Sequence, residues 1–236
     1  MTGQTKQQTA AALAQHVADG NALFNGDETS MRVQVARGAP RLVVVTGDNA
    51  SGKSLYVRCV AAVFQRDGGR PITVSIRERT GAGLDEMAGM RRIMMFGDDS
   101  DQSTGATSVK ATKAAFNNLD RPEGSALILD EPEMGLSEAY SRALGEFIGQ
   151  QALNVPSVCA GVLVVTHSRA LVRGLIAGYG QLPTHASVSA DAPAVADLNG
   201  WLDAVEHRSV EQLLALRDEG LDRWRTVTKI LEARRK

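Results

Sequence analysis

The fold is decided by the stretch Gly47-Asp48-Asn49-Ala50-Ser51-Gly52-Lys53-Ser54. Only Thr46 separates this stretch from the apolar run Leu42-Val43-Val44-Val45 that precedes it. The stretch matches the pattern G-x-x-x-x-G-K-[ST]. This pattern binds phosphate when a β-branched strand precedes it and a helix follows it, as Leu55, Tyr56 and Val57 indicate here. The sequence therefore predicts a strand, a phosphate-binding glycine loop at residues 47–54, and a helix.

The glycine loop has the residue types that a bound triphosphate requires. Gly47 and Gly52 let the backbone curl, so that successive N–H groups converge on phosphate at a helix N-terminus. Lys53 is expected to reach the β- and γ-phosphates, and the Ser54 hydroxyl is expected to ligate Mg²⁺. The predicted nucleotide-binding residues are Gly47, Asp48, Asn49, Ala50, Ser51, Gly52, Lys53, Ser54 and Leu55. The alternative is a glycine turn with a surface lysine, which the flanking strand and helix disfavour.

Composition narrows the class of protein. The 236 residues are 43% hydrophobic, which is enough for one sizeable α/β core. The net charge of −1 gives no overall basic field that would favour nucleic acid. Cys59 and Cys159 are expected to be buried thiols in a reducing compartment. Because no apolar run approaches the ~20 residues of a membrane span, and the first residues lack a signal-peptide pattern, we expect a cytoplasmic protein without a membrane segment.

A second apolar run, residues 126–129, ends in the acid pair Asp130-Glu131. A buried parallel strand delivers such acids to the carboxyl edge of a sheet, where ligands of open α/β folds bind. Asp130 is therefore predicted to hold Mg²⁺ together with Ser54, and Glu131 to activate a water as general base. The alternative is a solvated loop, which would leave the glycine loop without its metal partner.

A third apolar run, residues 162–165, is followed by Thr166-His167-Ser168. His167 would donate to the γ-phosphate or hold the attacking water, although a lone histidine is usually a satisfied polar residue. The remaining histidines lie in no such pattern, and we interpret them as surface or packing residues: His16, His185 and His207.

Together, the three strand ends resemble the ABC-type ATPase superfamily. Residues 127–137 look like its Walker B motif, catalytic glutamate and D-loop, and residues 164–168 look like its switch histidine. The resemblance covers about residues 32–180. It implies an α/β P-loop NTPase of ABC type with a mostly parallel sheet flanked by helices, a small antiparallel strand subdomain and C-terminal helices. It also implies catalytic roles for Glu131 and His167 and Mg²⁺ bound with ATP.

The same family has a signature motif that contacts the γ-phosphate of the opposite subunit. The matching position is residues 102–108, with Ser103 and Gly105 as the residues acting in trans. The transporter form LSGGQ is absent, and residues 92–99 are similar to the run before the signature serine in MutS-type ATPases. The resemblance is thus nearer to MutS-like and SMC-like ATPases than to transporter subunits, although a long heptad insertion is lacking.

Two features depart from the family pattern. No glutamine follows the expected strand at residues 72–76, where Arg77-Glu78-Arg79 stands instead. Before the glycine loop, Phe24 is the sole aromatic candidate for stacking on an adenine.

The expected organisation is an ATPase domain at residues 1–180 with a peripheral N-terminal helix, followed by a C-terminal helical extension at residues 181–236 packed on or near the core. Residues 181–200 look like a loop with a short strand at 186–189. Beyond the capping-box pattern of Ser209 and Gln212, apolar residues recur at helical spacing. Gly220 is expected to divide them into two amphipathic helices.

The leading hypothesis is Mg²⁺-dependent ATP hydrolysis between the subunits of a head-to-tail homodimer, driving a conformational switch in DNA maintenance, genome defence or a mobile element. A protein partner is expected, and nucleic acid stays open as a partner. One alternative is a nucleotide-gated protein-binding module with little turnover, which the missing glutamine favours. Another is the ATPase subunit of a transporter, which would require a membrane partner.

Overall fold

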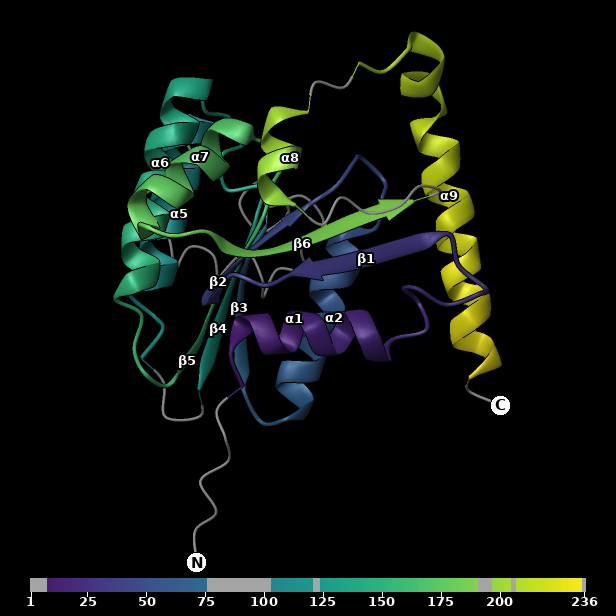
Figure 1. Cartoon of the computed structure of the whole chain (residues 1–236), viewed down its shortest axis with the longest axis horizontal. Helices are drawn as coiled ribbons and strands as arrows, with labels where there is room; N and C mark the ends of the chain where they lie inside the picture. Colours follow the sequence, from purple (N-terminus) through teal and green to yellow (C-terminus); the bar gives the residue numbers. More distant parts are fainter. Residues whose placement is uncertain (1–7, 76–102, 121–123, 191–196, 205–206, 235–236) are drawn as a thin grey trace, which may run out of the picture.

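A computed structural model describes residues 8–75, 103–120, 124–190, 197–204 and 207–234. Helices and strands alternate along most of the chain (Figure 1). Their bounds are α1 Ala10–Gly20, β1 Met31–Ala36, β2 Ala39–Thr46, α2 Lys53–Arg66, β3 Arg70–Val74, α5 Thr104–Phe116, β4 Ser125–Asp130, α6 Glu138–Leu153, β5 Cys159–Val165, α7 Arg169–Tyr179, β6 Pro183–Ala190, α8 Leu198–Asp203 and α9 Val210–Ala233.

The strands form one six-stranded sheet in the order β1-β6-β2-β5-β4-β3. The pairs β6–β2, β2–β5, β5–β4 and β4–β3 are parallel, and β1 pairs antiparallel with β6. The mostly parallel sheet flanked by helices is as predicted. Among the described residues, antiparallel pairing is confined to β1 with β6, so the antiparallel strands belong to the main sheet and form no separate subdomain there.

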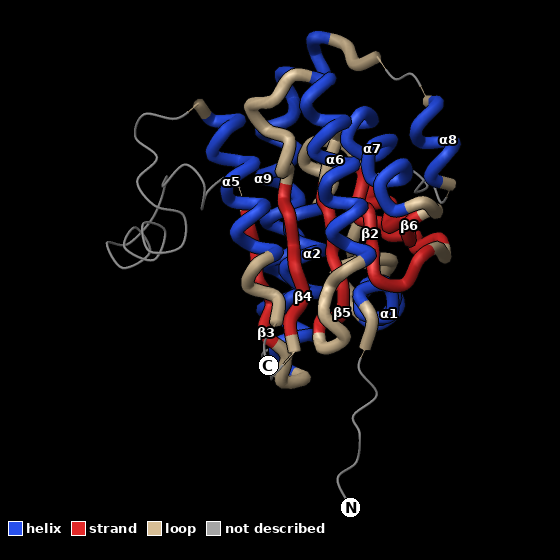
Figure 2. The backbone as a smooth tube through the Cα atoms, turned by 90° about the vertical axis from the view of Figure 1, so that its left-hand side faces the viewer, coloured by secondary structure: helices blue, strands red, loops and turns tan. Residues whose placement is uncertain are grey.

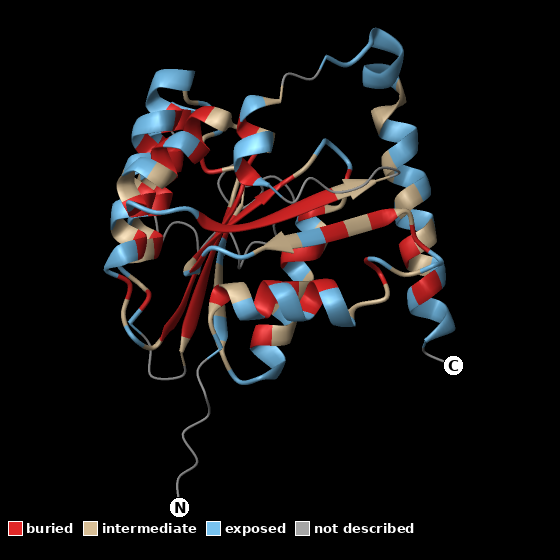
Figure 3. Ribbon diagram, in the orientation of Figure 1, coloured by how far each residue is buried: buried red, intermediate tan, exposed pale blue. Residues whose placement is uncertain are grey.

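Helices cover both faces of the sheet (Figure 2). Because side chains alternate along a strand, Val43 and Val45 of β2 pack with α1 and α2, whereas Leu42 and Val44 pack with α5, α6, α7 and α8. The central strands are almost wholly buried (Figure 3). This two-sided burial holds the carboxyl ends of β2, β4 and β5 at one edge.

Helix α1 is part of the core, so the prediction of a peripheral helix is wrong. Its residues Leu13, Ala14 and Val17 are buried in the cluster that contains β2 and α2. The Tyr56 hydroxyl donates to the Ala14 carbonyl at 2.7 Å. The spacing of these apolar residues is that of a helix with one buried face, which the high alanine content obscured.

Strand β6 lies between β1 and β2, where the sequence predicted only a short strand within a loop. Its composition is dominated by threonine, serine and alanine, which lack the apolar run of a central strand. Its polar groups have partners inside the sheet, since the Thr184 hydroxyl donates to the Ala39 carbonyl at 3.1 Å. The helical extension therefore begins only after β6.

Helix α9 runs without a break through Gly220, so the two predicted helices are one. The predicted capping box is present: the Gln212 amide donates to Ser209 Oγ and the Ser209 amide donates to Gln212 Oε1. The Arg223 guanidinium reaches Glu219 Oε2 at 3.1 Å, which links adjacent turns on either side of Gly220. In the described part of the chain, no helix is long and apolar enough to cross a membrane.

Candidate nucleotide-binding site

The glycine loop (residues 47–54) joins the buried end of β2 to α2 and lies between α8 and α9 in Figure 1. Gly47 has φ 149° and Gly52 has φ 102°, so both take conformations that favour glycine. Ala50 at the apex also has a positive φ, of 57°. A Cβ on Gly47 would lie 2.0 Å from the Val188 carbonyl oxygen of β6. The loop is thus curled as predicted, and β6 fixes its first glycine.

Lys53 points into this curl. Its Nζ donates to the carbonyl oxygens of Gly47 at 3.0 Å and Asp48 at 2.7 Å. Burial lowers the pKa of Lys53 to about 8, and the charges of Glu131, Asp130 and Asp48 oppose that shift. The predicted lysine and the predicted acids therefore lie close enough to interact.

Glu131 and His167 meet at the ends of β4 and β5. His167 Nε2 lies 3.3 Å from Glu131 Oε1, and both side chains are about one-third exposed. Glu131 has φ 50°, a left-handed conformation that costs a non-glycine residue about 1–3 kcal/mol and often marks a functional site. Its amide donates to the Val165 carbonyl at 2.9 Å, which ties the end of β4 to β5.

Behind this pair, Glu133 links the two strand ends. The Thr166 hydroxyl donates to Glu133 Oε1 at 2.5 Å and accepts from the Ser168 amide at 2.8 Å. Glu133 Oε2 is buried with no hydrogen-bond partner among the described residues. Burial raises the pKa of Glu133, and the hydrogen bond from Thr166 opposes the rise. The sequence analysis gave Glu133 no role, although it stands only two residues after the predicted catalytic acid Glu131.

Ser54 and Asp130, the predicted Mg²⁺ ligands, offer the hard oxygen donors that the ion prefers. Ser54 is exposed at the start of α2, and Asp130 is half-buried at the end of β4. Among the described residues, no three histidine, cysteine, aspartate or glutamate side chains cluster as a metal cage. The donor types of Ser54 and Asp130 suit an ion whose remaining ligands would be phosphate oxygens and water.

His185 is buried, as expected for a packing residue, but it lies next to the glycine loop. It is 1% exposed on β6, and its Nε2 lies 2.8 Å from the hydroxyl of Thr46, the residue before the glycine loop. Sequence analysis did not place it there because β6 was not recognised as a central strand. His16 and His207 are exposed.

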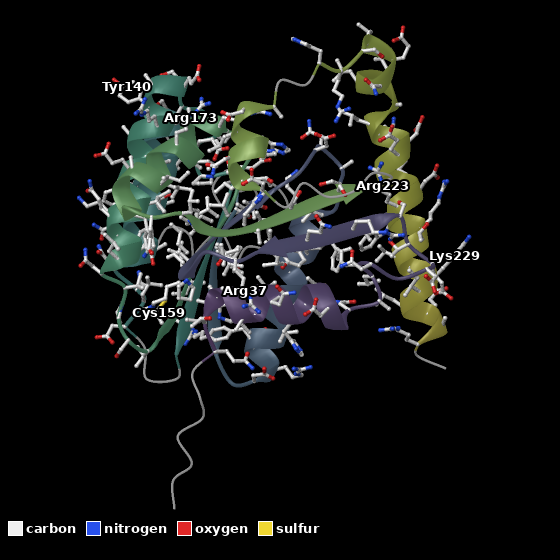
Figure 4. The ribbon with its side chains drawn as sticks, viewed as in Figure 1. Arg37, Tyr140, Cys159, Arg173, Arg223 and Lys229 are labelled. Carbon is white, nitrogen blue, oxygen red and sulfur yellow. The ribbon has the colours of Figure 1, made fainter. Side chains whose placement is uncertain are left out.

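Helix α9 lies across the glycine loop, a contact that sequence analysis missed. The Arg223 guanidinium donates to the Ala50 carbonyl at 2.8 Å, and Arg208 pairs with the Asp48 carboxylate. A Cβ on Gly220 would lie 3.8 Å from the Ala50 Cβ. Figure 4 shows Arg223 on the side of α9 that faces the sheet.

Two cavities lie between α9 and the carboxyl ends of the parallel strands. One is lined by Lys53, Ser54, Glu131 and His167 together with Trp224 of α9. The other is lined by the glycine loop from Gly47 to Asn49, by His167, Arg169 and Trp201, and by the first half of α9. The first cavity contains Lys53, Ser54, Glu131 and His167, whereas Gly47 and Asp48 line only the second; Asp130 lines neither.

The predicted trans residues lie elsewhere in the subunit. Ser103 is exposed at the N-cap of α5, where its Oγ accepts from the Ala106 amide at 3.3 Å. Gly105 packs on the segment after β4, since an added Cβ would lie 2.7 Å from the Gly135 carbonyl oxygen. Neither residue lines either cavity beside α9.

Phe24 cannot serve as the predicted stacking aromatic. It is 2% exposed and forms an edge-to-face pair with Tyr56, with ring centroids 5.4 Å apart. Residues 77–79 and 92–99, on which the family comparison partly rests, lie outside the described residues.

No protein-family model, curated protein or solved structure matches this chain.

Proposed function

We propose that this protein is a Mg²⁺-dependent ATPase of ABC type. The observation that carries the proposal is the cavity in which Lys53 and Ser54 of the glycine loop face Glu131 and His167 from two neighbouring strand ends. A generic phosphate-binding loop needs only the first two residues. The acid and the imidazole, 3.3 Å apart, add the groups that water activation requires.

In the proposed mechanism, the loop amides and Lys53 bind the β- and γ-phosphates. Ser54 and Asp130 would hold Mg²⁺, and the ion would then neutralise charge that develops on the phosphate oxygens. Glu131 takes a proton from a water that attacks the γ-phosphorus, and the bond to the β-phosphate oxygen breaks to give ADP and phosphate. His167 orients Glu131 or donates to the γ-phosphate. The Glu133–Thr166 hydrogen bond keeps the two strand ends in register.

The Glu131→Gln variant tests this mechanism. The amide keeps the shape of the side chain but cannot accept the proton, so turnover should fall about 10²–10⁴-fold while ATP binding is retained. Steady-state phosphate release and equilibrium ATP binding measure the two effects. Glu138→Gln, on the exposed first turn of α6, is the matched control. Unchanged turnover in Glu131→Gln would remove Glu131 from the mechanism.

The proposed active form is a head-to-tail homodimer in which Ser103 of one subunit contacts the γ-phosphate held by the other. The exposed position of Ser103, outside the cavities of its own subunit, supports this arrangement. Mixing Lys53→Ala subunits with Ser103→Arg subunits should restore one composite site. No recovery in a verified mixed dimer would contradict the arrangement. The proposed role remains a switch in DNA maintenance, genome defence or a mobile element.

A second candidate is a nucleotide-gated binding module with little turnover. The contacts of Arg223 with Ala50 and of Arg208 with Asp48 favour it, because occupation of the glycine loop would be transmitted directly to α9. Phosphate release separates the candidates, since a gated module binds ATP without steady-state turnover.

A further inference from the structure

The cavity that contains the proposed triphosphate site is also lined by apolar residues. Besides Lys53, Ser54, Glu131 and His167, its lining includes Met31, Leu55, Trp224 and Val227. A nucleotide whose phosphates occupy the glycine loop also carries a ribose and an aromatic base. The base needs a surface of this chemical character, with apolar side chains and one aromatic ring.

The course of α9 separates the two parts of the site. Arg208, just before the helix, pairs with Asp48 at the start of the glycine loop. The helix crosses the loop at Ala50, which Gly220 and Arg223 contact. Further along, Val227 is buried in the cluster that contains Met31, and Leu55 packs against that cluster. Trp224 is placed between the crossing at Ala50 and this apolar cluster. It therefore lies beyond the loop apex from Asp48.

Trp224 has the free surface that a stacking residue requires. The residue is 59% exposed although it lines the cavity. Phe24 is buried against Tyr56 and has no such surface. The second tryptophan of the chain, Trp201, lines the cavity that borders the start of the glycine loop, and its ring already contacts the Arg169 guanidinium, which lies 5.0 Å from the ring centroid.

We propose that Trp224 of α9 stacks on the base of the bound nucleotide, with the partly buried Leu55 beside it and the buried Met31 and Val227 supporting the base site from the core. This proposal rests on the proposed function, since it assumes a triphosphate in the glycine loop. It assigns α9 a direct part in nucleotide binding: the helix closes the site by contacting the ligand as well as the loop. Base–aromatic stacking is tolerant of base identity, so adenine and guanine nucleotides are bound with similar affinity.

The test compares MgATP with inorganic tripolyphosphate, which offers the phosphates without a base. Stacking on an aromatic side chain is worth an amount that corresponds to about 5- to 150-fold in affinity. Trp224→Ala should weaken MgATP binding by a factor in that range and leave tripolyphosphate binding unchanged, as measured by calorimetry. Trp224→Phe should keep most of the MgATP affinity. Leu231→Ala, at another exposed apolar position of α9, should change neither affinity.

Fluorescence gives an independent measurement. In a Trp201→Phe background, Trp224 is the only tryptophan, so MgATP should change its emission and tripolyphosphate should not. Equal weakening of both ligands by Trp224→Ala would overturn the proposal, because the ring would then only support α9. Unchanged MgATP affinity in Trp224→Ala would overturn it as well. If the wild-type protein bound neither MgATP nor tripolyphosphate, the proposed function itself would fail. This outcome is distinct from the two that overturn only the role of Trp224, because both of those require a wild-type protein that binds ligand.

Discussion

The glycine loop and helix α9 touch at Ala50, but the rest of the molecule holds them very differently. The loop follows β2, whose residues Leu42 to Val45 are completely buried between β5 and β6. Helix α9 buries only Val227 and Ile230 and leaves most of its large apolar residues exposed: Val210, Leu213, Leu214, Leu221, Trp224 and Leu231 (Figure 3).

This difference in burial separates the residues proposed for catalysis from the segment proposed to respond to the nucleotide. The groups assigned to chemistry, Lys53, Glu131 and His167, stand on strand ends and a helix start anchored in the core. Segments with few buried apolar contacts open at lower free energy than the core. Helix α9 is such a segment, and it reaches the loop through Arg223, while Arg208 just before the helix pairs with Asp48. We infer that the loop supplies fixed geometry and α9 supplies the part that responds.

Gly47→Ala, on the rigid side, is expected to have the largest effect. The new methyl group would lie 2.0 Å from the Val188 carbonyl oxygen, at a φ of 149°. Overpacking and backbone strain together should lower the free energy of unfolding by about 2–4 kcal/mol. Urea unfolding followed by circular dichroism measures it. A loss well below 1 kcal/mol would show that β6 moves to accommodate the methyl group. The glycine loop would then be no more rigidly held than α9.

Nucleotide affinity should depend on pH through Lys53. Its pKa of about 8 is below the ordinary value of 10.5, so the ammonium is mostly present at pH 7 and mostly lost at pH 9. Since phosphate binding requires the charged form, affinity should fall about tenfold between these values. Calorimetric titration with MgATP measures the change, and Lys229→Ala, at an exposed position of α9, should keep the same dependence. A flat profile would mean that Lys53 titrates outside this window.

Gly220→Ala, on the α9 side, should have a small effect of opposite sign. A Cβ there would lie 3.8 Å from the Ala50 Cβ, an ordinary contact, and alanine favours a helix over glycine by about 0.5–1 kcal/mol. Amide hydrogen exchange across residues 210–233 should slow about two- to fivefold. Faster exchange would show instead that the methyl group forces α9 off the loop, and that the contact at Ala50 is tighter than the geometry indicates.

Much of the candidate site could be predicted because each part is local in sequence. The pattern at residues 47–54 and the apolar runs before Asp130 and Thr166 contain their own strand signals, and parallel strands bring their carboxyl ends to one edge. The position of β6 could not be predicted in this way. Its serines, threonines and alanines are buried only because neighbouring strands satisfy its backbone and polar groups.

The sequence by itself determined where the glycine loop lies, which strand ends supply acids and an imidazole, and that a helix with a capping box begins after Ser209. Local patterns suffice for these, because strand propensity, glycine conformation and helical periodicity act within a few residues of each other. Only the tertiary structure decided that Val188 confines Gly47, that His185 contacts Thr46 and that α9 crosses Ala50. Each of these contacts joins residues more than 130 positions apart, and packing of the whole core selects them.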